Sequence, residues 1–165
     1  MNKNDRFLIA IVAGAGVLLV AAFLFALQRP DPGYRPDDSP ENIVHNYLLA
    51  IENRDYARAY TYLSPDLGGY PPDLETFIQD TERNSWNFRR DVDHSLSIQS
   101  SRVVGAETIV LVRLTEYYNN LPFGSQQNTN TFAMRLKPGG AGWVLVSGEQ
   151  FFWECWNKLE PYCRY

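Results

Sequence analysis

The pattern of hydrophobic and polar positions changes twice along the chain, and its first part is an uninterrupted apolar run. Residues 7–27, FLIAIVAGAGVLLVAAFLFAL, contain no charged side chain. A helix rises about 1.5 Å per residue, so a run of this length spans roughly the 30 Å of a bilayer's hydrocarbon core. The run therefore predicts a single transmembrane helix. A cleaved signal peptide is the alternative, although its apolar region is usually shorter and ends in small residues near the cleavage site.

The charges that flank this run decide its expected orientation. Lys3 and Arg6 precede it, and Arg29 and Arg35 follow it, so the basic residues on the two sides are nearly balanced. A short basic start before a first span commonly exports the residues that follow. We therefore expect residues 1–6 to be a cytoplasmic tail. The rest of the chain is expected on the periplasmic or outer face of a bacterial cytoplasmic (inner) membrane.

The helical period of 3.6 residues begins after a proline-rich stretch. Residues 28–38 contain three prolines and a glycine, which predicts a semi-extended tether. The domain is expected to begin at Ser39, since Ser, Pro and an acidic residue in succession are typical of a helix start. The apolar residues that then recur at helical spacing are Ile43, Val44, Tyr47, Leu48 and Ile51. Two shorter helices are expected, one capped by Asp55 with Tyr60 on its apolar face and one over residues 72–83.

The period then changes from 3.6 to 2, which predicts strands. Four strands are expected over residues 96–98, 106–118, 131–137 and 142–153. The polar residues 117–130 predict a long loop with Leu121 and Phe123 at its apolar tip. Helices followed by an antiparallel meander are the order of an α+β domain, with about three helices packed on a curved, mostly antiparallel four-stranded sheet.

The segment SPENIVHNYLLAIENRDYARAYTYLSPD resembles the opening of the nuclear-transport-factor-two-like (SnoaL-like) superfamily, and the hairpin FAMRLKPGGAGWVLV is similar to that family's strands. The resemblance covers about residues 39–153 and is closest in style to small, membrane-tethered bacterial members of unassigned function. It implies a cone-shaped domain over residues 39–165, in which a bent sheet wraps a long helix and leaves a pocket at its mouth. It also makes a homodimer through the open sheet face an expectation to test.

Charge and composition limit the partners. Beyond the first six residues, 13 basic residues stand against 18 acidic ones, which argues against nucleic acid, because phosphate contacts need clustered Lys and Arg. Aromatic residues make up 14% of the chain, as expected of a globular domain. The expected partners are the lipid bilayer and integral-membrane proteins.

The two cysteines, Cys155 and Cys163, fall in the part of the chain expected outside the cytoplasm. An oxidising compartment favours a disulfide between them, and two buried free thiols are the alternative. No C-x-x-C or haem-attachment motif occurs, so we expect no cofactor. The two histidines are far apart in sequence, which makes a poor metal site.

Candidates for a pocket are few. Glu116 is in phase with the inward Val110, Val112 and Leu114 and is the best of them, with Tyr60 and Trp143 as further pocket candidates. Asp93 and His94 precede the first expected strand and are expected in a solvated turn, with a position facing a pocket as the alternative. Neither a nucleophile elbow nor a phosphate loop nor a zinc motif occurs, so we predict no catalytic residue and no enzyme.

Candidates for contact surfaces are more numerous. Strand alternation would place Phe151 and Trp153 on one face, and Phe152 and Trp156 on the other. The folded-back tail, a second subunit or the membrane interface would cover the second set. Ala10 and Gly14 form a small-residue pair in the expected span. The interface candidates are Ala10, Gly14, Leu121, Phe123, Phe152 and Trp156.

Two functions follow as hypotheses. The first is a non-catalytic, single-span accessory or assembly subunit that docks on a larger bacterial membrane complex, such as one of respiratory or photosynthetic electron transfer. The second is a tethered small-ligand-binding module, or an acid–base enzyme that uses the cone pocket.

Overall fold

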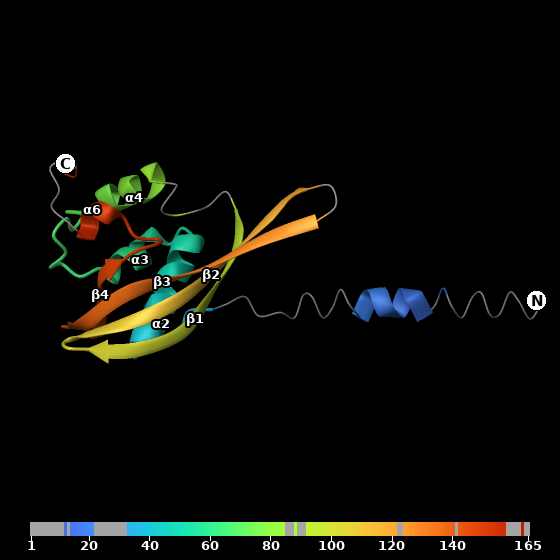
Figure 1. The fold of residues 1–165 in the computed structure, drawn as a ribbon, viewed down its shortest axis with the longest axis horizontal. Helices are drawn as coiled ribbons and strands as arrows, with labels where there is room; N and C mark the ends of the chain where they lie inside the picture. Colours follow the sequence, from blue (N-terminus) through green and yellow to red (C-terminus); the bar gives the residue numbers. More distant parts are fainter. Residues whose placement is uncertain are drawn as a thin grey trace, which may run out of the picture. The chain divides into compact units, whose positions relative to one another are not determined.

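The computed structural model describes residues 12, 14–21, 33–84, 88, 92–121, 124–140, 142–157 and 163, and divides into two compact units, Met1–Gly33 and Tyr34–Tyr165 (Figure 1). In the first unit, residues 14–21 are helical and include the interface candidate Gly14. No helix in the described part of the chain is long and apolar enough to cross a membrane. More than half of the predicted span, together with the interface candidate Ala10, lies outside the described residues.

The second unit starts with three helices whose ends follow the predicted capping chemistry. These are α2 (Pro40–Glu52), α3 (Tyr56–Thr61) and α4 (Leu74–Arg83). The side chains of Ser39, Asp55 and Asp73 each accept a hydrogen bond from the backbone N–H three residues later, at 3.3, 3.3 and 2.8 Å. Each cap satisfies one of the amides that a helix start leaves unpaired. The Ser39 and Asp55 caps predicted from the sequence are confirmed.

The four strands form one antiparallel sheet in the order β1-β2-β3-β4. Their bounds are Asp93–Val104, Glu107–Leu121, Gly124–Gly139 and Gly142–Gly148, and a short helix, α6 (Glu154–Asn157), follows. The predicted α+β class with a curved four-stranded antiparallel sheet is confirmed. Helix α2 contacts β1, β2 and β4 and lies across the inner face of the sheet (Figure 1).

Two strand predictions are wrong in length. The expected loop over residues 117–130 is largely strand, because β2 continues to Leu121 and β3 starts at Gly124. The hairpin extends past the helices, and residues 126–131 on its β3 side are exposed, so this stretch shows no apolar alternation. The last strand was expected to reach Trp153 but ends at Gly148, where a Cβ atom would come within 2.7 Å of Phe152.

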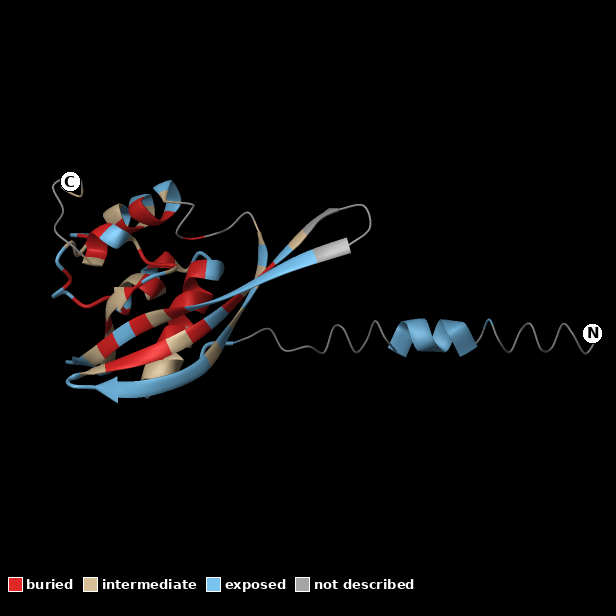
Figure 2. Ribbon diagram, in the orientation of Figure 1, coloured by how far each residue is buried: buried red, intermediate tan, exposed pale blue. Residues whose placement is uncertain are grey.

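The aromatic C-terminal segment is buried within its own domain (Figure 2). Trp156 is 0% exposed, and its Nε1–H donates to Asp80 Oδ2 at 2.9 Å. Its ring stacks on Phe77 at 5.0 Å and packs edge-on against Phe152 at 5.1 Å. Phe152 and Trp156, two of the interface candidates, are therefore unavailable to a partner in this structure. The chain turns at residues 149–153 and enters α6, so strand alternation does not hold there.

The tail is also held covalently. Cys155 and Cys163 form the predicted disulfide, with their Cα atoms 5.3 Å apart. The amide of Asn157 pairs with both backbone groups of Gly148, donating to its C=O at 2.9 Å and accepting from its N–H at 3.4 Å. These contacts fix α6 against the end of β4.

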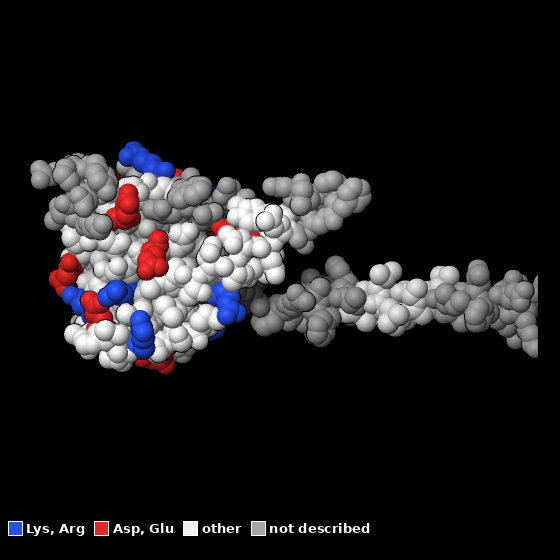
Figure 3. Space-filling view, in the orientation of Figure 1, with Lys and Arg blue, Asp and Glu red and all other residues white. Residues whose placement is uncertain are grey.

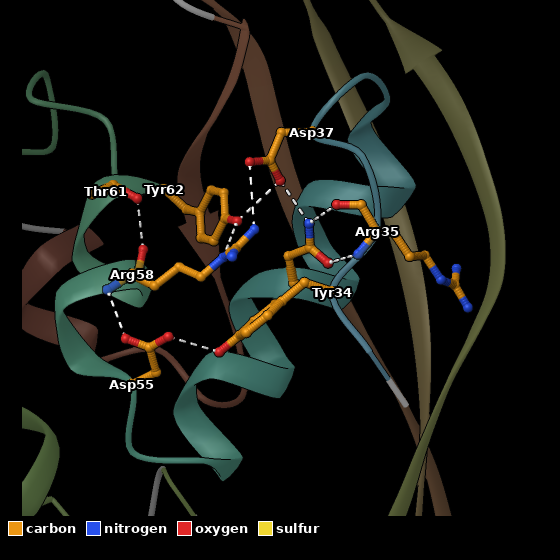
Figure 4. A network of polar contacts seen from close by, with 8 residues as sticks. Tyr34, Arg35, Asp37, Asp55, Arg58, Thr61 and Tyr62 are labelled. Atoms are coloured by element: carbon orange, nitrogen blue, oxygen red, sulfur yellow. Dashed lines mark hydrogen bonds and ion pairs between the residues drawn. The ribbon is translucent and has the colours of Figure 1, made fainter. Parts of the chain in front are cut away.

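The second half of the predicted tether is docked on the domain, which begins five residues before Ser39 (Figure 4). Asn46 is fully buried and pairs with both backbone groups of Arg35 at 2.8 Å, and it also donates to Asp37 Oδ1 at 2.6 Å. A side-chain amide that imitates a strand partner satisfies the polar groups of the segment it covers. Asn46 therefore fastens residues 34–37 to α2.

Helix α3 holds the same segment from the other side. The Arg58 guanidinium lies 3.7 Å from the centre of the Tyr34 ring, and its Nε donates to Tyr62 Oη at 2.9 Å. Tyr62 in turn donates to Asp37 Oδ1 at 3.0 Å, and Tyr34 donates to Asp55 Oδ2 at 2.9 Å. The hydrogen bond to Tyr62 raises the pKa of Arg58, so this guanidinium stays charged.

We predict that Trp156→Ala lowers the free energy of unfolding by about 3–5 kcal/mol, because it opens a cavity in the aromatic cluster and removes a hydrogen-bond donor to the buried Asp80 carboxylate. The measurement is urea unfolding of the full chain in detergent. Trp153→Ala is the matched control, since Trp153 is only half-buried and should cost less. Equal losses for the two variants would show that the Trp156 cluster is not the anchor of the tail.

Candidate functional site

The inner face of the sheet changes from apolar to polar along the strands. Side chains opposite each other on neighbouring strands point to the same face. Successive rows across β1, β2 and β3 are Ile98–Val112–Phe132, Leu96–Leu114–Asn130 and His94–Glu116–Asn128. The last row lies toward the end of the sheet from which the β2–β3 hairpin extends. A polar row at the edge of an apolar face is typical of a binding site.

His94 is the central titratable group of this row. Its side chain is 14% exposed, Nδ1–H donates to the carbonyl of Val92 at 3.0 Å, and Nε2 pairs with Glu52 Oε1 at 3.1 Å. Both ring nitrogens face acceptors, which favours the protonated ring. The hydrogen bond to Glu52 raises the pKa of His94 above its usual 6.5 against the opposing effect of burial, and the charges of Glu52 and Glu116 add to the rise.

Glu116 is 1% exposed, as its place in phase with the inward strand residues predicted. Tyr118 Oη donates to its Oε2 at 3.0 Å. Glu116 lines a cleft of about 340 Å³ together with Leu114, Asn130, Thr131, Phe132, Glu149 and Gln150. We call this the β3 cleft. It combines an apolar floor with two carboxylates.

A second cleft, of about 440 Å³, opens on the other side of the row. We call it the His94 cleft. Its apolar lining comes from Ile51, Phe88, Val92 and Phe151, and its polar lining from Glu52, Arg54, Asp93 and His94. It therefore joins the end of α2 to the start of β1.

Phe151 separates the two clefts. Its ring lies 5.5 Å from that of His94 and 6.0 Å from that of Phe132, which lines the β3 cleft. Its backbone is left-handed, with φ of 54°, a conformation that bulky residues rarely adopt. The buried Tyr47 hydroxyl donates to the Phe151 carbonyl at 2.7 Å and holds the turn in this form. Burial raises the pKa of Tyr47 well above its usual value, so the hydroxyl remains a donor.

Arg54 is the other non-glycine residue with a positive φ in the described part of the chain, at 57°. It follows the end of α2, where glycine is the usual residue. Both strained residues line the His94 cleft. Strain of this kind persists where the surrounding structure enforces it and is often found at functional sites.

The structure does not bring the other pocket candidates to Glu116. Trp143 pairs with Pro138, at the opposite end of β3 from Asn128, the partner of Glu116. Tyr60 donates to the Pro71 carbonyl at 2.9 Å and stacks on Tyr70 at 5.4 Å. Neither lines the two clefts described above.

Two residues of the predicted apolar tip can be placed only in part. The backbone of Leu121 ends β2, and Phe123 lies outside the described residues.

The basic and acidic side chains on the face shown in Figure 3 are interspersed and form no single-sign patch there.

For His94 the sequence favoured the wrong alternative, and it gave no indication of Phe151 as a cleft residue. The expectation of a solvated turn at Asp93 and His94 is wrong, because β1 starts at Asp93. A signal was present, since His94 is in phase with Leu96 and Ile98 and so shares their inward face. No local signal marks Phe151, whose conformation depends on a hydrogen bond to a residue 104 positions away.

Two features of this site bear on its chemistry. Both nitrogens of His94 are engaged by groups of the chain itself. No group of three His, Cys, Asp or Glu side chains placed to hold a metal ion occurs among the residues that the structure describes.

No family model matches the sequence, and no curated protein matches it. Similar solved structures include a SEC-C motif containing protein from Rhodopseudomonas palustris, with 17% identity, a TM-score of 0.46 and coverage of 70% of this chain and 81% of that one. A protein from Thiobacillus denitrificans described as a calcium/calmodulin-dependent protein kinase type II association domain has 11% identity, a TM-score of 0.48 and coverage of 68% and 93%. An NTF2-like protein from Burkholderia thailandensis has 15% identity, a TM-score of 0.42 and coverage of 68% and 88%. Likenesses at this level carry no inference about what this chain binds.

We predict that Tyr47→Phe lowers the free energy of unfolding by about 1–3 kcal/mol, because the buried Phe151 carbonyl loses its donor. Tyr34→Phe is the control, since the hydrogen bond from its hydroxyl to Asp55 is exposed to solvent and its loss should cost about 0.5 kcal/mol or less. Chemical denaturation of both variants measures the difference. A Tyr47→Phe protein as stable as the control would refute the role of this hydrogen bond.

We also predict a pH-dependent contribution of His94 to stability. The folded-state pKa is raised, so the stabilisation is fully present below about pH 6.5 and is lost as the pH rises through the folded-state pKa. The free-energy difference between the wild type and His94→Gln should therefore shrink as the pH rises. NMR titration of the His94 ring should give a lower pKa in Glu52→Gln and an unchanged one in Glu75→Gln, which alters an exposed carboxylate outside the cleft.

Proposed function

We propose that this chain is a membrane-anchored, non-catalytic binding module of the nuclear-transport-factor-two-like superfamily, with its site in the His94 cleft. The observation that carries the proposal is the polar row His94–Glu116–Asn128 at the end of the apolar inner face of the sheet. The two residues with a strained backbone, Arg54 and Phe151, line the cleft beside His94. The superfamily assignment is supported by the element order, three helices and then a curved antiparallel meander, with α2 on the inner face.

The lining of the His94 cleft indicates its ligand class. Ile51, Phe88 and Phe151 offer apolar walls. The charge of Glu52 is paired with His94, whereas Arg54 is exposed and makes no ion pair within the described part of the chain. A small molecule with an aromatic or apolar body and an anionic group would match these features. The ligand's anion would lie against Arg54.

Anchoring and compartment form the second part of the proposal. We place residues 7–27 across the cytoplasmic membrane and the domain on its outer face. In the helical residues 14–21 and at Val12, the large apolar side chains are exposed, with Leu18 and Leu19 both at 72%. Such surfaces are favourable in lipid and unfavourable in water. The Cys155–Cys163 disulfide supports an oxidising compartment.

Docking on an integral-membrane partner is our second candidate function. The observation that favours it is an apolar pair at the β1–β2 turn, where Val103 is 75% exposed and Val104 is 48% exposed. Native mass measurement after mild detergent extraction separates the candidates. Co-migration with a multi-subunit complex supports docking, and a lone monomer or homodimer supports the binding module.

We predict that Arg54→Gly separates stability from binding. A left-handed backbone costs a non-glycine residue about 1 kcal/mol, so glycine should leave the free energy of unfolding unchanged or raise it by up to about that amount. The same change should weaken binding of two-ring aromatic carboxylates, such as 2-naphthoate, by about tenfold, since it removes the cation. NMR shifts of the His94 and Phe151 rings measure the binding to the full chain in detergent.

The control is Arg102→Gly, which removes an exposed arginine of β1 outside the cleft and should not change the binding. Aromatic amines should bind Arg54→Gly and the wild type equally. If naphthoate shifts no residue of the His94 cleft, or binds Arg54→Gly as well as the wild type, the proposed site is wrong.

A further inference from the structure

The β3–β4 side of the sheet has two ends, and their backbone groups are covered differently. At the end away from the β2–β3 hairpin, residues 62–64 cover the outer edge of β4. Leu145 N–H donates to the Tyr62 carbonyl, and Ser64 N–H donates to the Leu145 carbonyl, both at 2.8 Å. Toward the hairpin, β4 pairs with β3 only as far as Met134 opposite Gly148. The stretch of β3 from Gly124 to Ala133 therefore extends beyond β4.

One backbone group shows which positions of this stretch face the open side. Ala133 N–H donates to Glu149 Oε2 at 3.1 Å, so Ala133 directs its polar groups away from β2. Alternate residues of a strand direct their N–H and C=O to the same side. Since β3 pairs with β2 without a register shift from Leu136 to Gln126, the residues Gln127, Thr129 and Thr131 present their backbone groups to the open side as well.

This edge lacks the features that usually protect a strand edge. Residues 124–132, GSQQNTNTF, contain no charge and no proline, and residues 126–131 are exposed. Natural edges are commonly protected by lysine, proline or a bulge. The opposite edge strand, β1, has a register shift between Ile98 and Ser100 and carries charges at Asp93 and Arg102. Of these two edges, the stretch of β3 is therefore the one without a register shift or charged side chains that would hinder pairing with another strand.

The β3 cleft adjoins this edge on the inner face of the sheet. Asn130, Thr131 and Phe132 of the edge line the cleft together with the carboxylates of Glu116 and Glu149. A strand added beside β3 would direct every second side chain to the inner face, next to this cleft. A cationic side chain would match the two carboxylates.

We propose that the open edge of β3 at Gln127, Thr129 and Thr131 binds an extended peptide as a further strand, with a lysine or arginine of the peptide in the β3 cleft. A second copy of this chain is the less suitable occupant, because its own edge residues 124–132 contain no basic side chain. The Phe151 ring lies between this cleft and the His94 cleft, and the proposal does not depend on a ligand in the His94 cleft.

The test uses the full chain in lipid nanodiscs and a fluorescein-labelled nonapeptide of alternating threonine and valine with a central arginine. Fluorescence anisotropy measures binding. Replacing the arginine by citrulline, which has the same shape without the charge, should weaken binding about tenfold in the wild type and clearly less in Glu116→Gln, which keeps only the Glu149 carboxylate. Equal binding of the two peptides by the wild type would overturn the assignment of the cleft.

The backbone part of the proposal has its own variant. Thr129→Pro removes an N–H that faces the open side and spares the bonds to β2, so the domain should fold and bind the peptide at least about tenfold more weakly. N-methylation of alternate peptide amides tests the same contact with the wild-type protein. Methylation of the alternate amides that face β3 should abolish binding, and methylation of the amides that face away from β3 should be tolerated. Equal effects of the two phases would overturn strand addition.

Amide hydrogen exchange identifies the occupant. In the peptide-free protein, the amides of Asn128 and Asn130 should exchange slowly, and those of Gln127, Thr129 and Thr131 should exchange fast and become slow when the peptide is added. Slow exchange at all five amides without peptide, together with a dimer mass, would overturn the proposal in favour of a second copy.

Discussion

The hydrogen bond from the Tyr47 hydroxyl to the Phe151 carbonyl fixes the part of the molecule where the clefts meet. It is buried, 2.7 Å long, and joins the middle of α2 to a turn 104 residues later. The turn holds Phe151 in a left-handed conformation that its side chain disfavours. Without this bond, the Phe151 carbonyl would be buried and unsatisfied, and its ring would lose its place between His94 and Phe132. The two clefts therefore have separate linings because a core tyrosine fixes the ring between them.

Stability and strain are concentrated in different parts of the domain. The cluster around Trp156, the disulfide and the Asn157 cap hold the C-terminal segment to the sheet. Asn46 and Arg58 hold the segment that enters the domain. The strained residues Arg54 and Phe151 lie instead at the polar row. Strain costs of order 1–3 kcal/mol per residue, so it persists only where surrounding contacts enforce it.

Local chemistry in the sequence predicts most of the fold. The caps at Ser39 and Asp55, the α2 stripe and the switch from period 3.6 to period 2 each depend on residues close together in the chain, and all are found. The inward Glu116 follows from strand alternation alone. What fails depends on distant contacts: Gly148 ends β4 because Phe152 packs against it, and residues 34–37 dock because Asn46 is buried on α2. The polar stretch 126–131 shows no alternation, because its residues are exposed on both faces.

The extension of the β2–β3 hairpin past β4 has a consequence for the chemistry of the whole inner face. At the end of the sheet away from this hairpin, residues 62–64 cover the outer edge of β4 at Leu145, so the backbone groups of Leu145 are paired. At the hairpin end, β4 stops at Gly148, and the side chain of Glu149 takes the place of the next ladder bond by accepting from Ala133. A carboxylate caps one amide and cannot continue the ladder, so the sheet's hydrogen bonding stops where the inner face becomes polar. The open backbone edge and the acidic β3 cleft thus arise from the same cause, the early end of β4, which the packing of Phe152 on Gly148 imposes.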